Sequence, residues 1–172
     1  MKRKSYNKYH VSDKSIRTVD DIVFDSLLEA RLYVLLRDVI GLEAFSCQPL
    51  FTLQEGFRDS EGKWIRPIAY KADFLIPDGN HEIVVDTKGM KTPDFKLKLK
   101  MLKFQNREID IRLLSSQKSF VDFVLSLKEV PLIGQSFKLN TDEATRKALL
   151  QLRCKEIWAS TKQAKPDMKK GQ

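Results

Sequence analysis

The sequence predicts an α/β fold with the core order αβββαβ, in which helices cover a mixed four-stranded sheet. Residues 26–40 have the apolar spacing of an amphipathic helix. Three segments typical of strands follow, at 44–54, 65–77 and 81–88. A helix start at 92–94 then separates the third strand from a fourth at 108–114. Because a helical crossover joins parallel strands and a short loop joins antiparallel ones, the sheet should be mixed.

The first helix has one broad apolar face and a clear end. Its members recur at three- and four-residue spacing: Leu28, Leu32, Leu35, Leu36, Val39 and Ile40. Gly41 follows as a typical residue just beyond a helix C-terminus. The helix should therefore pack one side against the sheet.

The three strands are separated by different kinds of connection. Pro49 in the first strand indicates a sheet edge or a bulge, because proline cannot donate to a strand ladder. Residues 55–64, EGFRDSEGKW, are typical of a turn-rich loop. Asp78-Gly79-Asn80 has the composition of a tight hairpin turn. The second and third strands should thus be antiparallel neighbours.

Three further helices are expected. Thr92, Pro93 and Asp94 are typical of a helix N-terminus, so the alternating run after them is assigned to a helix over 94–104. Residues 117–128 show a second amphipathic pattern, and 141–159 form a C-terminal helical extension.

The net charge of +8 is concentrated in three segments. Lys and Arg exceed Asp and Glu by five in 1–17, by four in 91–103 and by three in 161–172. We divide the chain into a basic arm (1–20), a core (21–130), the helical extension (131–160) and a flexible basic tail (161–172). The basic periphery favours a polyanionic partner, although solvated tails explain the same charges equally well.

Composition also excludes several classes. Apolar residues make up 42% of the chain, typical of a globular protein, and no apolar run is long enough for a membrane helix. The basic N-terminus lacks the apolar stretch of a signal peptide. Cys47 and Cys154 do not have metal-site spacing, so we expect reduced thiols and an intracellular protein without a membrane partner.

Two acids and a base should meet at the end of the third strand. A two-residue loop at Gly79-Asn80 would place Asp73 directly opposite Asp86, whereas a loop at Asp78-Gly79 would make them diagonal neighbours on the same face. Only a loop with an odd number of residues would separate them. Lys88 shares the face of Asp86, because strand side chains alternate with period two.

A divalent cation would relieve the repulsion between facing carboxylates. Mg²⁺ or Mn²⁺ takes oxygen ligands, so Asp73, Asp86 and the backbone carbonyl of Thr87 are candidates, with Lys88 beside them. The alternative is a solvated pair of Asp86 and Lys88 at a strand end, with Asp73 unrelated to it. Spacing alone leaves both open.

Glu29 also has two explanations. Ser26 and Glu29 fit a capping box, which requires no function. On a helical wheel, however, Glu29 lies about 60° from the centre of the apolar stripe, so it leans toward the sheet. A carboxylate there is costly unless it is paired or metal-bound.

Four blocks in this order resemble small phage and prophage nucleases of the PD-(D/E)xK superfamily: FDSLLEARLY, SCQPLFTL, YKADFLI and VVDTKGMKTPDFKLK. The resemblance covers roughly residues 20–128, and the broad pattern is shared with Holliday-junction resolvases and the endonuclease subunit of Tn7-type transposases. It implies a restriction-endonuclease-like sheet and makes 21–130 a nuclease core.

The resemblance implies a role for each matching residue. Glu29 matches the first-helix acid that helps to hold a metal, Asp73 the motif aspartate, Asp86 the D/E position and Lys88 the lysine. Gln48 matches a glutamine near the site in several relatives. Two departures matter: Ala72 replaces the signature proline, and Asp86 replaces the more usual glutamate, which is longer by one methylene.

The expected function is a Mg²⁺- or Mn²⁺-dependent DNA endonuclease that acts on branched or recombination DNA, in a bacterial or phage-infected cytoplasm. A cluster of lysines near the second helix is expected to bind DNA phosphates: Lys91, Lys96, Lys98, Lys100 and Lys103. The alternatives are a transposase- or restriction-type nuclease that needs a partner subunit, and a catalytically silent DNA-binding module. A homodimer, or a partner protein on the C-terminal helix, is also open.

Overall fold

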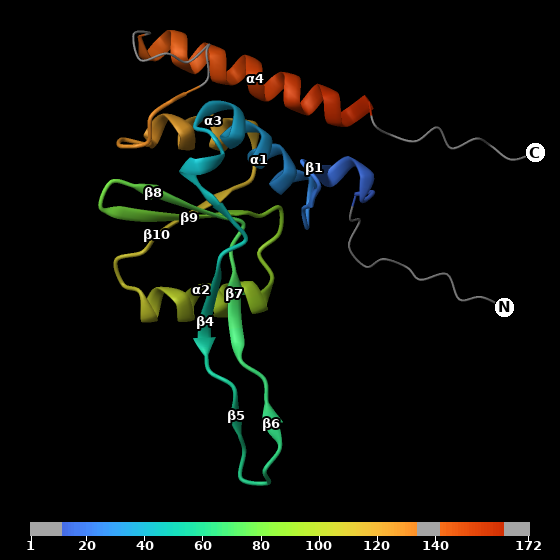
Figure 1. Cartoon of the computed structure of the whole chain (residues 1–172), viewed down its shortest axis with the longest axis vertical. Helices are drawn as coiled ribbons and strands as arrows, with labels where there is room; N and C mark the ends of the chain where they lie inside the picture. Colours follow the sequence, from blue (N-terminus) through green and yellow to red (C-terminus); the bar gives the residue numbers. More distant parts are fainter. Residues whose placement is uncertain (1–11, 134–141, 164–172) are drawn as a thin grey trace, which may run out of the picture.

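The computed structural model describes residues 12–133 and 142–163, and Figure 1 shows how they stack in layers. A sheet lies at the centre, with α2 (Pro93–Gln105) on one face. α1 (Leu27–Val39) and α3 (Gln117–Ser126) lie on the other face. α4 (Glu143–Gln163) crosses over α1 and α3 as an outer layer.

The central sheet has four strands and is mixed, as the sequence predicts. Its order is β10 (Asp110–Leu114), β9 (His81–Thr87), β8 (Phe74–Asp78) and β3 (Ser46–Cys47). β9 and β10 run parallel because α2 connects them, and the other pairs are antiparallel. The prediction of an α/β fold with a mixed sheet is confirmed at this level.

Alternation along β9 divides the core between the two faces. Ile83 and Val85 pack with the apolar residues of α1, α3 and α4. Val84 packs instead with Phe95 and Leu102 of α2. β9 is therefore covered on both sides, and this burial fixes the position of its polar C-terminal end.

Helices α1 and α2 begin at residues whose side chains can cap a helix N-terminus. Ser26 accepts a hydrogen bond from the Glu29 amide and starts α1. Thr92 does the same for the Phe95 amide, with Pro93 in the first turn of α2. Capping thus overrides the strand-like alternation of the sequence that follows Pro93.

Two segments predicted as single strands are each broken in two. Gln48 has a left-handed backbone conformation (φ 55°) and precedes Pro49, so the first segment divides into β3 and β4 (Leu50–Gln54). The other segment divides at Ala72–Asp73 into β7 (Ile68–Lys71) and β8. β4 and β7 pair only with each other within the described residues. They leave the central sheet as a separate two-stranded ribbon.

The ribbon continues where the sequence indicated a loop. β5 (Phe57–Arg58) pairs with β6 (Trp64–Ile65), and the ribbon extends well beyond the body of the protein (Figure 1). The turn is closed by Asp59, whose Oδ1 accepts hydrogen bonds from the amides of Glu61 and Lys63. These local bonds allow strand pairing to continue almost to the tip.

The expected N-terminal arm is partly structured. Within residues 12–20 there is a 3₁₀ turn, η1 (Ser15–Arg17), followed by β1 (Thr18–Val19), which pairs with β2 (Ile22–Val23). The Arg17 guanidinium donates to the carbonyl of Phe24. Residues 1–11 lie outside the described part of the chain, as do residues 164–172 of the predicted tail.

The C-terminal helix is part of the packed core. Leu150, Cys154 and Ile157 of α4 are buried against α1 and α3, and the Trp158 ring contacts Phe120 edge-on. One face of α4 is therefore covered by the chain itself, and docking of a partner protein on this helix remains a prediction. None of the described helices combines the length and the apolar character needed to cross a membrane.

Candidate active site

The β8–β9 hairpin brings Asp73 and Asp86 together. Asp78 pairs with His81 across the two-residue loop Gly79-Asn80, and Phe74 pairs with Val85 at the other end. One further step places Asp73 beside Asp86, just where the chain bends out of β7. This is the register that the sequence predicts for a loop at Gly79-Asn80.

Asp86 is a fully buried carboxylate with two close partners. Its Oδ2 accepts a hydrogen bond of 2.5 Å from the hydroxyl of Tyr70. Its Oδ1 lies 2.5 Å from the Lys88 Nζ, yet that approach lacks hydrogen-bond geometry, and Oδ1 has no hydrogen-bond partner within the described residues. A buried carboxylate oxygen with only an ion pair is costly, which is a common property of functional sites.

Asp73 is held by the residue that ends β9. Its Oδ2 accepts hydrogen bonds of 2.6 Å from both the amide and the hydroxyl of Thr87. No hydrogen bond to Asp73 Oδ1 is present in the described part of the chain. The carboxylate is thus oriented through one oxygen while the other stays available.

Glu29 forms part of the helix cap and is also buried beside the sheet. The Glu29 amide donates to Ser26, while its side chain accepts from the Asp25 amide at 2.8 Å, one residue before the expected partner. The side chain is also 99% buried and accepts a hydrogen bond of 3.2 Å from Gln48 Nε2. Gln48 therefore links α1 to the strands of the site.

The charges at the site influence one another. Burial raises the pKa of Asp73 to about 6, and the nearby charges of Asp86 and Glu29 act in the same direction. Burial also raises the pKa of Glu29. Burial lowers the pKa of Lys88, but its ion pair with Asp86 and the charges of Asp73 and Glu29 outweigh this, so the pKa is raised overall. Raised pKa values for two carboxylates and for the neighbouring Lys88 ammonium indicate a local excess of negative charge.

The donor set fits a hard divalent cation with few protein ligands. Within 12–133 and 142–163, no three His, Cys, Asp or Glu side chains are grouped closely enough to hold a metal ion. Mg²⁺, however, commonly binds one or two carboxylates and completes its shell with water and substrate phosphate. Asp73 and Asp86 each keep an oxygen without a hydrogen-bond donor, so these two residues would hold the ion. Glu29 and the Thr87 carbonyl remain predicted ligands.

α2 begins beside this site, as expected from its position after Gly89. The ring of Phe95, in the first turn, lies 5.4 Å from the Lys88 Nζ. Lys96, Lys100 and Lys103 are exposed and follow one another at helical spacing, so they form a single basic stripe. Lys98 pairs with Asp94 at 3.5 Å, and Lys91 is exposed before the helix. Phosphate binding by these lysines remains a prediction.

Residues 6–120 match the model of a family described as "Protein of unknown function (DUF1064)". The match covers about two thirds of the chain. The chain belongs to the DUF1064 family. Searches of the curated proteins and of the solved structures found no match. The DUF1064 segment includes every candidate site residue from Glu29 to Lys103, whereas α4 lies beyond it.

Two contributions of this DUF1064 chain are not apparent from the sequence. Tyr70, which belongs to the two-stranded ribbon, donates a hydrogen bond to Asp86 in the central sheet. Thr87 donates its amide and its hydroxyl to Asp73, whereas only its carbonyl was predicted to take part in the site. A tyrosine within an apolar strand usually needs a hydrogen-bond partner for its hydroxyl, so the sequence did indicate that Tyr70 would have one. The identity of the partner depends on how β7 bends relative to β9.

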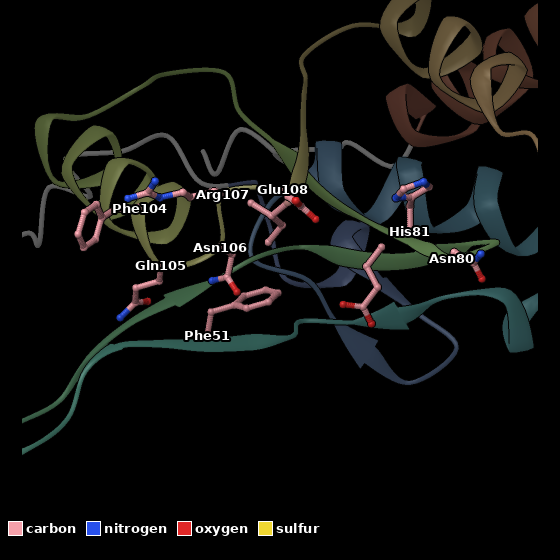
Figure 2. A pocket seen from close by; sticks show the side chains of 10 residues that line it. Phe51, Asn80, His81, Phe104, Gln105, Asn106, Arg107 and Glu108 are labelled. Carbon is pink, nitrogen blue, oxygen red and sulfur yellow. The ribbon is translucent and has the colours of Figure 1, made fainter.

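A large surface hollow of about 840 Å³ lies elsewhere in the DUF1064 domain. Figure 2 shows its lining side chains, which include Phe51, Asn80, His81, Phe104 and Arg107. The hollow is at the start of β9, and the acids are at the end of this seven-residue strand. None of the candidate catalytic residues lines it.

Proposed function

We propose that this protein is a Mg²⁺- or Mn²⁺-dependent DNA endonuclease with a restriction-endonuclease-like core, as the PD-(D/E)xK resemblance implies. The observation that carries the proposal is the meeting of Asp73, Asp86 and Lys88 at one end of β9. Glu29 reaches the same cluster through Gln48. Four charged side chains from three segments therefore lie near one another at the end of β9.

The position of each side chain suggests a role in phosphodiester hydrolysis. A divalent ion, when bound, would stabilise the charge on the attacking and leaving oxygens. Asp73 and Asp86 would hold it, and Thr87 keeps Asp73 in a fixed orientation. Lys88 supplies an ammonium that can orient a water molecule or bind a phosphate oxygen. Tyr70 fixes the second oxygen of Asp86, so that the carboxylate cannot rotate freely.

The surroundings of the cluster fit a nucleic-acid substrate. The basic stripe of α2, Lys96, Lys100 and Lys103, starts near Lys88 and faces solvent. Such a stripe can neutralise phosphates on either side of the one that is cut. A role in resolving branched DNA is our first choice of substrate, and it rests on the family resemblance alone.

A cleavage panel tests the proposal. The full chain is incubated with a four-way junction, a flap, single-stranded DNA, linear duplex and supercoiled plasmid, each with Mg²⁺, Mn²⁺ or EDTA. We expect metal-dependent cutting of at least one substrate. Asp73→Asn and Lys88→Met should reduce cutting by at least 10²-fold, whereas the exposed Lys118→Ala on α3 should cut like the wild type. Circular dichroism shows whether each variant is folded.

A second candidate function, a silent DNA-binding module, is favoured by the burial and pairing of Asp86. Its Oδ2 is hydrogen-bonded to Tyr70, and its Oδ1 is in an ion pair with Lys88. If wild type binds DNA but cuts no substrate with either metal, the silent module is correct and the endonuclease proposal fails. Cutting that appears only after a second subunit is added would indicate the partner-dependent nuclease.

A further inference from the structure

The two-stranded ribbon is anchored at the candidate site. β4 leaves the central sheet directly after Gln48, and β7 ends just before Asp73. The Gln48 amide donates to the Asp73 carbonyl at 2.8 Å, and the Ala72 amide donates to Pro49 at 3.1 Å. The base of the ribbon is thus joined to two residues of the proposed active site.

The ribbon is ordered as far as its tip. The Arg58 guanidinium donates to the carbonyl of Gly62 at 2.8 Å, which adds to the Asp59 turn. The Trp64 indole lies against the Gly56 backbone, where a Cβ atom would come within 2.4 Å of the ring. A large aromatic side chain is therefore held in place on an exposed element.

One face of the ribbon combines this aromatic ring with positive charge. Trp64 is 54% exposed and pairs directly with Arg58, so both side chains point to the same face. Arg66, two residues after Trp64 in the connection between β6 and β7, is also exposed. The Trp64 face thus carries Arg58 directly across from the aromatic ring, with the exposed Arg66 close to Trp64 in the chain.

We propose that the Trp64 face binds an unstacked base of the nucleic-acid substrate, with Arg58 and Arg66 contacting the adjacent phosphates. This inference rests on the proposed function, because it defines the substrate class as DNA with unpaired bases, such as a single strand or a branch point. Aromatic rings stack on any base, and flanking arginines add phosphate and cation–π contacts. A duplex with all bases stacked offers no such partner.

The length of the ribbon determines where that base lies. Asp73 follows Trp64 by nine positions, which corresponds to roughly 30 Å of extended chain. In a duplex this is the rise of about nine base-pair steps. The ribbon would therefore place the unstacked base up to about one helical turn from the scissile phosphate.

The test is a set of binding measurements in EDTA, where no cleavage can occur. Fluorescence anisotropy gives the Kd of the full chain for single-stranded DNA, a four-way junction and a linear duplex of equal length. Trp64→Ala should weaken binding to the first two about tenfold and to the duplex less than threefold. Trp64→Phe keeps an aromatic ring and should stay within threefold of wild type. Phe57→Ala, on the opposite face, is the matched control and should change nothing.

The outcomes separate this inference from the endonuclease proposal. Equal losses in Trp64→Ala and Phe57→Ala, or no loss in Trp64→Ala, would overturn the inference. Wild-type DNA binding by Trp64→Ala together with altered self-association in sedimentation would mark the face as a protein contact and would also overturn it. A selective loss in a protein that never cuts DNA would support the inference while the endonuclease proposal fails.

Discussion

Thr87 donates both its amide and its hydroxyl to one oxygen of Asp73, so the end of β9 orients the acid that directly precedes β8. The acid opposite to it in register, Asp86, is oriented by Tyr70 from β7. Each carboxylate is therefore positioned by a residue from another segment, Asp73 by Thr87 of β9 and Asp86 by Tyr70 of β7.

Removing the Tyr70 hydroxyl should destabilise the protein. Tyr70→Phe leaves the buried Asp86 Oδ2 without its hydrogen bond, which should lower the free energy of unfolding by about 1–3 kcal/mol. Tyr33→Phe is the matched control, because its partner Asp20 is 43% exposed and can bind water instead. Urea denaturation at pH 7 measures both. An equal loss of unfolding free energy in the two variants would show that the hydrogen bond to the buried Asp86 contributes no more than the one to the exposed Asp20.

The elevated pKa of Asp73 should make the metal-free protein less stable as the pH rises. The folded state holds this proton up to a pKa of about 6, whereas the unfolded chain loses it near 3.8, so stability falls between about pH 4 and 6. Asp73→Asn cannot titrate and should show a smaller fall. Urea midpoints in EDTA at pH 4.5 and pH 7 provide the comparison; parallel profiles for the two proteins would refute it.

Divalent cations should stabilise the folded protein through Asp86. At 10 mM Mg²⁺ or Mn²⁺ we expect the melting temperature of wild type to rise by a few degrees, because the ion binds only the folded state. Asp86→Asn should abolish the rise. Asp122→Asn, which removes a partly exposed acid on α3, should retain it. A rise that survives in Asp86→Asn would place the ion elsewhere.

The basic stripe of α2 should dominate the salt dependence of DNA binding. Replacing Lys96, Lys100 and Lys103 with alanine should weaken binding and reduce the slope of log K against log salt by about two to three. The control removes the same charge from the opposite side of the molecule, at Lys118, Lys147 and Lys155. Filter binding between 50 and 200 mM KCl measures the slopes. Similar slopes for both triple variants would show that the basic stripe of α2 is not the main phosphate-binding surface.

α4 should behave as part of the core rather than as a docking segment. Leu150→Ala removes a fully buried side chain and should cost about 2–5 kcal/mol of stability. Leu152→Ala, at a position that is 55% exposed, should cost less than about 0.5 kcal/mol. Both are measured by urea denaturation. A small effect at Leu150 would mean that α4 packs only weakly on α1 and α3.

Much of the architecture follows from local chemistry that is readable in the sequence. Thr92 and Pro93 specify the start of α2, even though the residues after them alternate like a strand. The Gly79-Asn80 turn determines the hairpin register, and with it the approach of Asp73 to Asp86. These features depend on capping and turn residues within a few positions of one another, so they need no knowledge of distant contacts.

Other features depend on contacts between distant segments, and only the tertiary structure decided them. The breaks at Gln48 and Asp73 turn two predicted strands into a projecting ribbon, because the backbone there leaves one sheet and forms another. Tyr70 meets Asp86 only because of that bend. The sequence by itself therefore determined that Asp86 and Lys88 share a face at the end of β9, and that a two-residue loop in the hairpin would bring Asp73 to that face. Packing between non-neighbouring segments decided what holds them, since burial and hydrogen-bond partners are properties of the folded chain.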